Sequence, residues 1–401
     1  MILFKYEIKK LLFNKSRLIL LAAIFIICTL MGLLAAEGTL ALIKSDDYSE
    51  YIRLVSENTG KFNPEQLAES GPISEATEAE YRKGNEDGFY MYLHRNPIQK
   101  FHNDYAKFGK RVQEYWNGPE YQDKASILGV YPIKEKLKEL SDKTDTYEYK
   151  YYKHRLDTEL SLGEPVFENT LFWNYYSLAF DPSRVGLLLL MFLAFIISPV
   201  FTQEVKTDMD SIILCSVKGR REIVTAKLLC VCVVSAILTV IFFLGMFIGT
   251  YISYGNLDGF DAPARCFTGL EWTTLDTTVG GMAMLGVLWI ILAAMAFGLA
   301  ITLISAKLKN QTATFGLGVA MILTFALFGF LSDGLKELLG PLADFNYVAL
   351  SSYGVVFGGV KMYNIFGMPL SYGITAFMVC IALSVIAVLL AYIAQRRRSV
   401  M

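Results

Sequence analysis

Six long runs of apolar residues are separated by charged stretches along this chain. Each run reaches the length of roughly 17–25 residues that a helix needs to cross a bilayer. Backbone polar groups in lipid must find their hydrogen bonds within the segment, so we expect all six runs to be α-helices. The runs cover residues 18–36, 185–202, 228–254, 279–304, 312–331 and 372–394.

The amino-acid composition is that of a membrane protein. The 401 residues are 54% hydrophobic with a mean hydropathy of +0.39, whereas soluble domains are roughly 45–50% apolar. The formal net charge is −1, so no overall positive field indicates nucleic acid as a partner. We therefore predict an all-α polytopic membrane protein with six transmembrane helices in contact with lipid.

Lysine and arginine gather in four places, which all lie on one side of the membrane if the chain crosses it six times. These are the segment before the first run, two connections between runs, and the basic tail at 395–401. The positive-inside rule assigns that side to the cytosol, so we predict a multi-pass plasma-membrane protein with both termini cytosolic. The basic residues are Lys5, Lys9, Lys10, Lys15, Arg17, Lys206, Lys218, Arg220, Arg221, Lys227, Lys307, Lys309, Arg396, Arg397 and Arg398.

Residues 1–17 have the pattern of an amphipathic helix that lies in the cytosolic headgroup layer. A basic flank of the first span, without that role, is the alternative. Residues 35–38 resemble a cleavage site, but the preceding run is long enough to span, so we expect a retained anchor. One face of the predicted helix carries Phe4, Ile8, Leu11 and Leu12, and the other carries Lys5, Lys9 and Lys10.

The stretch 37–184 between the first two runs predicts a large, mainly helical extracellular domain. Asn96 and Pro97 are typical of a helix start, and glycines at 118 and 163 end two apolar stripes of helical spacing. Two stripes of similar length predict an antiparallel helical hairpin. The first contains Ile98, Phe101, Tyr105, Phe108, Val112 and Tyr115; the second contains Ile133, Leu137, Leu140, Thr144, Tyr147 and Tyr151. An interfacial aromatic belt is predicted at Phe172, Trp173, Tyr175 and Tyr176.

Histidine and cysteine give no sign of a metal site or a disulfide framework. His94, His102 and His154 all lie in the predicted outer domain, without the spacing of a zinc site. We interpret them as solvated or core histidines. The cysteines form no evenly spaced set, so structural disulfides are not expected. They are Cys28, Cys215, Cys230, Cys232, Cys266 and Cys380.

Small residues and proline mark special places in the remaining spans. Gly245 and Gly249 form a GxxxG pair that allows close helix approach, and Pro199 predicts a kink before the second connection. No charged residue lies in the middle of a run, which argues against a carrier coupled to protons or sodium. The stretch 332–371 predicts an outer, re-entrant or half-buried element that packs on protein.

Catalytic and nucleotide-binding motifs are missing from the sequence. There is no GxxxxGK[ST], GxSxG, HExxH or CxxC, so the chain is not expected to be an enzyme by itself. An enzyme acting on lipid-linked substrates would need a catalytic carboxylate or histidine near the outer face, and Glu271 and Asp276 are the carboxylates to test.

The charged connection at 203–227, QEVKTDMDSIILCSVKGRREIVTAK, is the main candidate site. It contains a short amphipathic unit between charged flanks, which favours contact with a partner protein. A solvated loop that only obeys the positive-inside rule is the alternative. The candidate residues are Glu204, Asp208, Asp210, Ile212, Ile213, Leu214, Lys218, Gly219, Arg220 and Arg221.

These features together resemble the permease subunits of ABC-2-type ABC transporters. The resemblance rests on the amphipathic start, on Glu204 after the second span, and on the pattern from Ser211 to Lys227 that contains Lys-Gly-Arg-Arg-Glu-Ile-Val. The stretch 37–184 departs from it, because many members have only a short loop there.

The resemblance implies an ATP-driven exporter whose separate cytosolic ABC ATPase docks on the 203–227 loop. It implies no cofactor on this chain, with ATP and Mg²⁺ bound by the partner, and a second permease subunit, identical or related. A peptide, antibiotic or lipid-like cargo is the expectation. The rival hypothesis is a polytopic sensor or scaffold whose outer domain binds a ligand without transport.

Overall fold

A computed structural model describes the fold over residues 2–35, 46–82, 96–118, 129–180, 186–207, 209, 219–267, 269–308, 310–328, 331 and 333–396. These residues are mostly helical, and six helices among them are long and apolar enough to cross a membrane, as predicted. The spans are α2 (Lys15–Ala35), α11 (Leu187–Ile197) continued by α12 (Pro199–Lys206), α14 (Gly219–Tyr254), α15 (Val279–Lys307), α16 (Gln311–Phe328) and α21 (Tyr372–Arg396).

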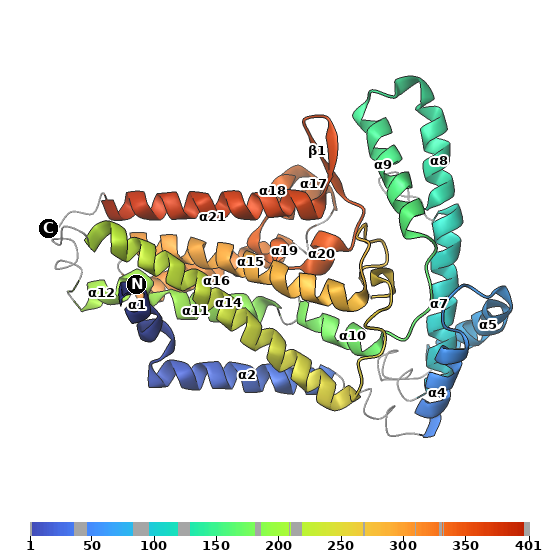
Figure 1. The fold of residues 1–401 in the computed structure, drawn as a ribbon, viewed down its shortest axis with the longest axis horizontal. Coiled ribbons are helices and arrows are strands. Elements are labelled where there is room, and N and C mark those ends of the chain that lie inside the picture. The colour runs from blue at the N-terminus through green and yellow to red at the C-terminus, as the bar shows by residue number, and fades with distance from the viewer. Residues whose placement is uncertain are drawn as a thin grey trace.

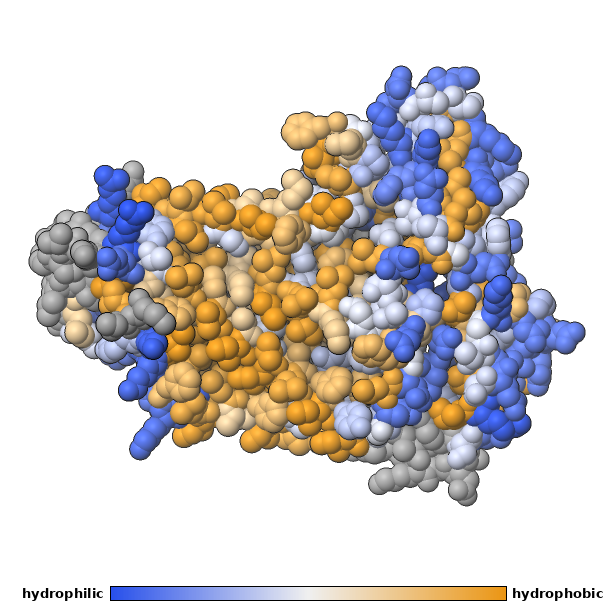
Figure 2. Space-filling model, in the orientation of Figure 1, coloured by the Kyte–Doolittle hydropathy of each residue, from blue (hydrophilic) through white to orange (hydrophobic). Residues whose placement is uncertain are grey.

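The six spans form one bundle with a different structure at each end (Figure 1). One end carries α1 (Ile2–Leu12), the last turn of α12, the start of α14 and the end of α21; we call it the basic end. The opposite end carries a polar domain, so we call it the domain end. Figure 2 shows a broad hydrophobic band between hydrophilic surfaces at the two ends, as a membrane-spanning bundle requires.

Helix α1 forms where the amphipathic pattern predicts it. Leu11 and Leu12 are buried, and α1 packs chiefly on α14, whereas Lys5 and Lys9 are exposed. Leu11 and Leu12 of the apolar face therefore rest on protein, whereas Leu3 and Tyr6 of the same helix are exposed. Glu7 lies on the same buried side, which the apolar pattern did not predict.

Glycine allows α2 and α14 to pack at backbone contact. A Cβ added at Gly249 would lie 2.1 Å from the carbonyl oxygen of Thr29, and one at Gly32 would lie 2.5 Å from that of Met246. Gly245 also lies against α2, because a Cβ added there would be 2.9 Å from Cβ of Cys28. The GxxxG prediction is confirmed, and α2 supplies a third glycine to the same interface.

The polar domain is built around α7 (Pro97–Asn117), whose start at Pro97 and end before Gly118 were predicted. Its aromatic stripe is buried against α4 (Asp46–Glu57), α5 (Pro64–Tyr81) and Phe167. T-shaped and tilted ring pairs such as Tyr105–Phe167, with centroids 5.1 Å apart, fill this core.

The second stripe does not form one helix, which corrects the predicted hairpin. It divides into α8 (Val130–Glu139), a 3-10 turn (η1, Ser141–Lys143) and α9 (Tyr147–Leu162), and α9 returns beside α8 while α8 extends the line of α7 (Figure 1). The polar run from Ser141 to Thr146 explains the break, because such side chains compete with helical hydrogen bonds. Thr146 caps α9 by accepting a bond from the Tyr149 amide at 3.4 Å.

A buried ion pair joins the polar domain to the connection between α14 and α15. Arg265, in the short 3-10 turn η4 (Ala264–Cys266), lies 2.8 Å from the carboxylate of Glu159 on α9, and both side chains are almost fully buried. Arg111 of α7 donates to the carbonyl of Arg265 at 3.2 Å. Two helices of the domain, α7 and α9, are therefore attached to the domain end of the bundle.

The predicted aromatic belt is mostly interior. Helix α10 (Leu171–Tyr176) and the turn η2 (Ser177–Phe180) bury Phe172, Trp173 and Tyr176 among protein side chains. The Phe172 ring meets Phe247 of α14 with centroids 5.5 Å apart. An interfacial belt would face headgroups, so the prediction is wrong for these three residues.

The segment before α21 contains a series of short elements. They are α17 (Asp333–Leu339), α18 (Pro341–Asp344), α19 (Tyr347–Leu350), α20 (Tyr353–Phe357), β1 (Met362–Ile365) and β2 (Met368–Ser371). Leu350 and Tyr353 are buried, and Trp289 of α15 donates to the Leu350 carbonyl at 2.7 Å. The half-buried element is confirmed at α19 and α20. The antiparallel β1–β2 hairpin, with positive φ at Phe366 and Gly367, was not predicted.

Candidate functional site

The two ends of the 203–227 loop lie on α12 and α14 at the basic end. Glu204 is on α12, Gly219 is the first residue of α14, and Arg221 is exposed on its first turn. The side chain of Arg220 is not described. Residues predicted for the middle of the loop lie outside the described residues: Asp208, Asp210, Ile212, Ile213, Leu214 and Lys218.

Glu204 points into the protein and binds two lysines from different helices. Its Oε1 lies 2.6 Å from Nζ of Lys227 on α14 and 3.2 Å from Nζ of Lys10 on α1. The side chain of Lys227 is 0% exposed, and that of Glu204 is 11% exposed. One carboxylate oxygen therefore joins three separate segments of the chain.

The ammonium group of Lys227 makes all of these contacts with residues of α12. Its Nζ also donates to the carbonyl of Val200 and lies 4.7 Å from the centre of the Phe201 ring. A buried ammonium is tolerated only where such partners replace water. Lys227 was predicted only as one of several basic residues on the cytosolic side.

Glu7 completes a four-residue charge cluster: Glu7, Lys10, Glu204 and Lys227. Its carboxylate lies 3.8 Å from Lys10, on the adjacent turn of α1. Burial raises the pKa of Glu7 above its ordinary value, while the positive charges of Lys227 and Lys10 partly oppose that shift. The cluster contains two carboxylates and two ammonium groups, so its formal charges balance.

Immediately beyond this cluster, the second span is interrupted at Ser198 and Pro199. Helix α11 ends at Ile197 and α12 begins at Pro199. Proline has no N–H, so the carbonyl of Phe195 cannot receive its regular helical bond. The hydroxyl of Ser198 donates to that carbonyl instead, at 3.0 Å. The boundary between α11 and α12 therefore falls where the kink was predicted, although Ser198 itself keeps helical dihedrals.

Side chains from two other spans repair the break. Ser305 of α15 accepts a bond from the Phe201 amide at 3.1 Å and donates to the Ser198 carbonyl at 2.9 Å. Arg17 of α2 donates to the Ile196 carbonyl at 3.0 Å. Backbone groups around the proline are therefore paired with side chains of α15 and α2, as occurs where side chains insert into a helical ladder.

A cleft of about 400 Å³ opens beside the charge cluster. Apolar side chains such as Leu3 and Ile223 line it together with Glu7, Lys10 and Glu204. Tyr6 and Met209 stand exposed at its edge. The cleft therefore offers both apolar contact and charge where α12 leads into the loop. Its lining comprises Leu3, Tyr6, Glu7, Lys10, Gln203, Glu204, Thr207, Met209, Ile223 and Ala226.

The other candidate residues do not gather into a second site. Among the described residues, no group of three or more His, Cys, Asp and Glu is placed to hold a metal ion. His94 lies outside the described residues, and His102 is buried with its Nδ1 3.0 Å from the Ser70 hydroxyl. Glu271 and Asp276 both lie in the α14–α15 connection at the domain end, with Asp276 on the surface.

Comparison with known proteins found no protein-family model and no curated protein that match this sequence.

Proposed function

We propose that this chain is the membrane-spanning permease subunit of an ATP-driven exporter of the ABC-2 type. The basic end faces the cytosol and receives a separate ATPase, which binds ATP and Mg²⁺. The polar domain is then extracellular. A second permease subunit, identical or related, completes the pathway, and the protein resides in the plasma membrane.

The observation that carries this proposal is the ion cluster of Glu204 with Lys10 and Lys227. It fastens both arms of the loop, α12 and α14, to each other and to α1. Buried ion pairs are costly to break singly, so a force applied to the loop moves these three segments together. A solvated loop without a mechanical role does not require such a link.

The break at Ser198 and Pro199 supplies the place where that movement is absorbed. Helix α12 can tilt against α11 there, because Ser305 and Arg17 provide alternative hydrogen-bond partners. The cleft beside Glu204 gives a partner element both apolar and charged contacts. ATP-driven closure of the partner is thus transmitted from the loop, through α12 and α14, into the membrane-spanning bundle.

The test is ATP hydrolysis by the complex of the chain with its ATPase in proteoliposomes. Replacing both Glu204 and Lys227 by Met removes the link without leaving a lone buried charge. We expect the stimulation of ATP hydrolysis by the permease to fall about 5- to 150-fold, the factor that corresponds to typical coupling free energies between two sites. The exposed control Lys307→Met, also at the basic end, should retain it. Equal stimulation in both variants would contradict the proposal.

A sensor or scaffold is the second candidate, and the docking of the polar domain favours it. The buried Glu159–Arg265 pair connects that domain to the bundle, as a ligand signal crossing the membrane would need. The two functions differ in energy use. A sensor works without any ATP-hydrolysing partner, so loss of such a partner would leave its output unchanged.

A further inference from the structure

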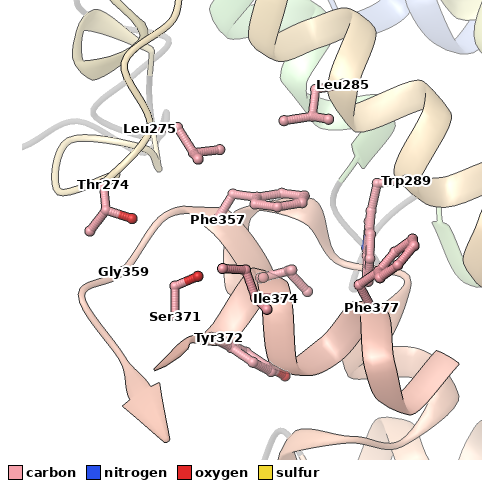
Figure 3. Close-up of a pocket in the computed structure, with 12 residues that line it drawn as sticks. Thr274, Leu275, Leu285, Trp289, Phe357, Gly359, Ser371, Tyr372, Ile374 and Phe377 are labelled. Atoms are coloured by element: carbon pink, nitrogen blue, oxygen red, sulfur yellow. The ribbon is translucent and has the colours of Figure 1, made fainter. Parts of the chain in front are cut away.

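An apolar cavity of about 370 Å³ lies at the domain end, between α15, α20 and α21 (Figure 3). Leu285 and Trp289 come from α15, Phe357 from α20, and Ile374 and Phe377 from α21. The side chains of these residues are directed toward a common space in Figure 3. The cavity has no connection with the charge cluster of the basic end.

The inner wall of the cavity is fixed by packing and by a hydrogen bond. Trp289 is buried, and its indole N–H donates to the Leu350 carbonyl at 2.7 Å. The Trp289 and Phe357 rings meet edge to face with centroids 5.5 Å apart. A Cβ at Gly373 would lie only 2.8 Å from the Phe357 ring. The hollow is therefore a formed feature of the fold.

The cavity opens onto the surface that lipid covers in a membrane-spanning bundle. Leu285, Ile374 and Phe377 are exposed apolar residues on two candidate spans and also line the cavity. No Asp, Glu, Lys, Arg or His contributes to the lining. The hydroxyl of Tyr372, the one titratable group of the lining, donates to the Asp344 carbonyl.

Polar groups occur on one side of the cavity. In Figure 3 the hydroxyls of Thr274 and Ser371 lie opposite the aromatic wall of Trp289 and Phe377. Both hydroxyls belong to the connection and strand that border the spans, on the side of the polar domain. A ligand with a hydrocarbon chain and a polar head matches this arrangement, because mostly apolar pockets use a few polar groups to fix orientation.

We propose that this cavity binds one acyl chain of a membrane phospholipid, with the headgroup toward Thr274 and Ser371. The acyl chain enters between α15 and α21 and lies against Trp289 and Phe357. The bilayer brings the ligand to the mouth wherever the spans are inserted. The proposal is independent of any ATPase partner and of transport.

The test uses phosphatidylcholine with a photoreactive diazirine on one acyl chain, incorporated into nanodiscs with the full-length protein. After irradiation, the labelled residues are mapped by mass spectrometry. We expect labelling of the half-buried Phe357 and, above all, of Trp289, which is buried and therefore out of reach of ordinary surrounding lipid. Labelling restricted to outward residues such as Leu288 would overturn the proposal. So would labelling of the cavity by a diazirine fatty acid but not by the phospholipid.

Two variants of α21 show whether the chain enters through the proposed mouth. Ile374→Trp narrows the cavity, whereas Met378→Trp adds the same bulk one turn further along the helix, at a residue outside the lining. The exposed fractions are 52% and 51%, so both substitutions face lipid rather than the core. Labelling of Trp289 and Phe357 should fall to the unirradiated background in Ile374→Trp only. Equal labelling in both would contradict entry at this mouth.

Discussion

Removal of the Lys227 ammonium is the sharpest perturbation of the charge cluster. Lys227→Met keeps a long side chain of similar shape in a fully buried position, but it eliminates the contact of 2.6 Å with Glu204. The Val200 carbonyl also loses a donor. Lys10 then remains as the single cation beside two carboxylates, so one negative charge is left without compensation.

The expected cost follows from the burial of these groups. Removing one partner of a buried ion pair costs about 3–5 kcal/mol, which is about two to four powers of ten in the folded-to-unfolded ratio. Glu7 limits the loss because burial already raises its pKa, so it takes up a proton more readily. Folding favours the protonated form of Glu7. The stability that Lys227→Met loses relative to the wild type should therefore become smaller as pH falls.

A double-mutant cycle in detergent solution measures this energy. The free energy of unfolding is compared for the wild type, Lys227→Met, Glu204→Met and the variant with both changes. We expect the double variant to regain most of the stability that either single variant loses, because two apolar side chains leave no buried charge. Lys307→Met, on an exposed lysine, should change stability by less than about 0.5 kcal/mol. If Lys227→Met changes the free energy of unfolding as little as Lys307→Met does, the buried charge cluster does not stabilise the fold.

Three further predictions concern other parts of the fold. Gly249→Val should separate α2 from α14, since even an added Cβ would lie 2.1 Å from the Thr29 carbonyl oxygen. The separation should appear as a lower yield of cysteine crosslinking between the two helices. Arg265→Met should cost about 3–5 kcal/mol by isolating the buried Glu159, seen as faster proteolysis within α9. Burial lowers the pKa of His102, so the unfolded state binds the proton more readily. Stability is then full above the ordinary pKa of about 6.5 and is lost as pH falls through the lower folded pKa. His102→Gln should flatten this dependence in thermal unfolding curves.

Each of these predictions has a matched control. Gly316 has open space around its added Cβ, so Gly316→Val should leave helix contacts intact. Arg53 forms exposed ion pairs with Glu50 and Glu57 of its own helix, and Arg53→Met should not accelerate proteolysis in α9. His154 is exposed on α9. His154→Gln should therefore leave the loss of stability at acid pH unchanged. A control that behaves like its partner variant would refute the corresponding argument.

The elements predicted best from the sequence are those set by local pattern. The six apolar runs correspond to the six candidate spans within a few residues except at the start of α14, which begins at Gly219 and not at residue 228. Length and hydropathy alone determine the spans, whereas the polar first turns of α14 lie outside the apolar run. The GxxxG pair and the bounds of α7 were also read correctly, because glycine and proline act through the backbone at their own positions.

Features that depend on distant residues were missed. Lys10, Glu204 and Lys227 are far apart in the sequence, so no local pattern shows that one oxygen joins them. The aromatic residues of α10 have the composition of a membrane interface, but tertiary packing places most of them against α14. One local feature was missed as well, because the turn at Phe366 and Gly367 lacks the usual Asn-Gly signal of a two-residue hairpin.

Placement of a photocrosslinking amino acid at Met209 tests the central claim most directly. Met209 lines the cleft beside Glu204 and is 50% exposed; Leu338, 81% exposed on α17 near the domain end, is the control. The proposal predicts that Met209 captures a protein with a P-loop ATPase sequence in native membranes and that Leu338 does not. Capture of the ATPase at Leu338 and not at Met209, or at neither, would contradict an ATPase partner at the basic end.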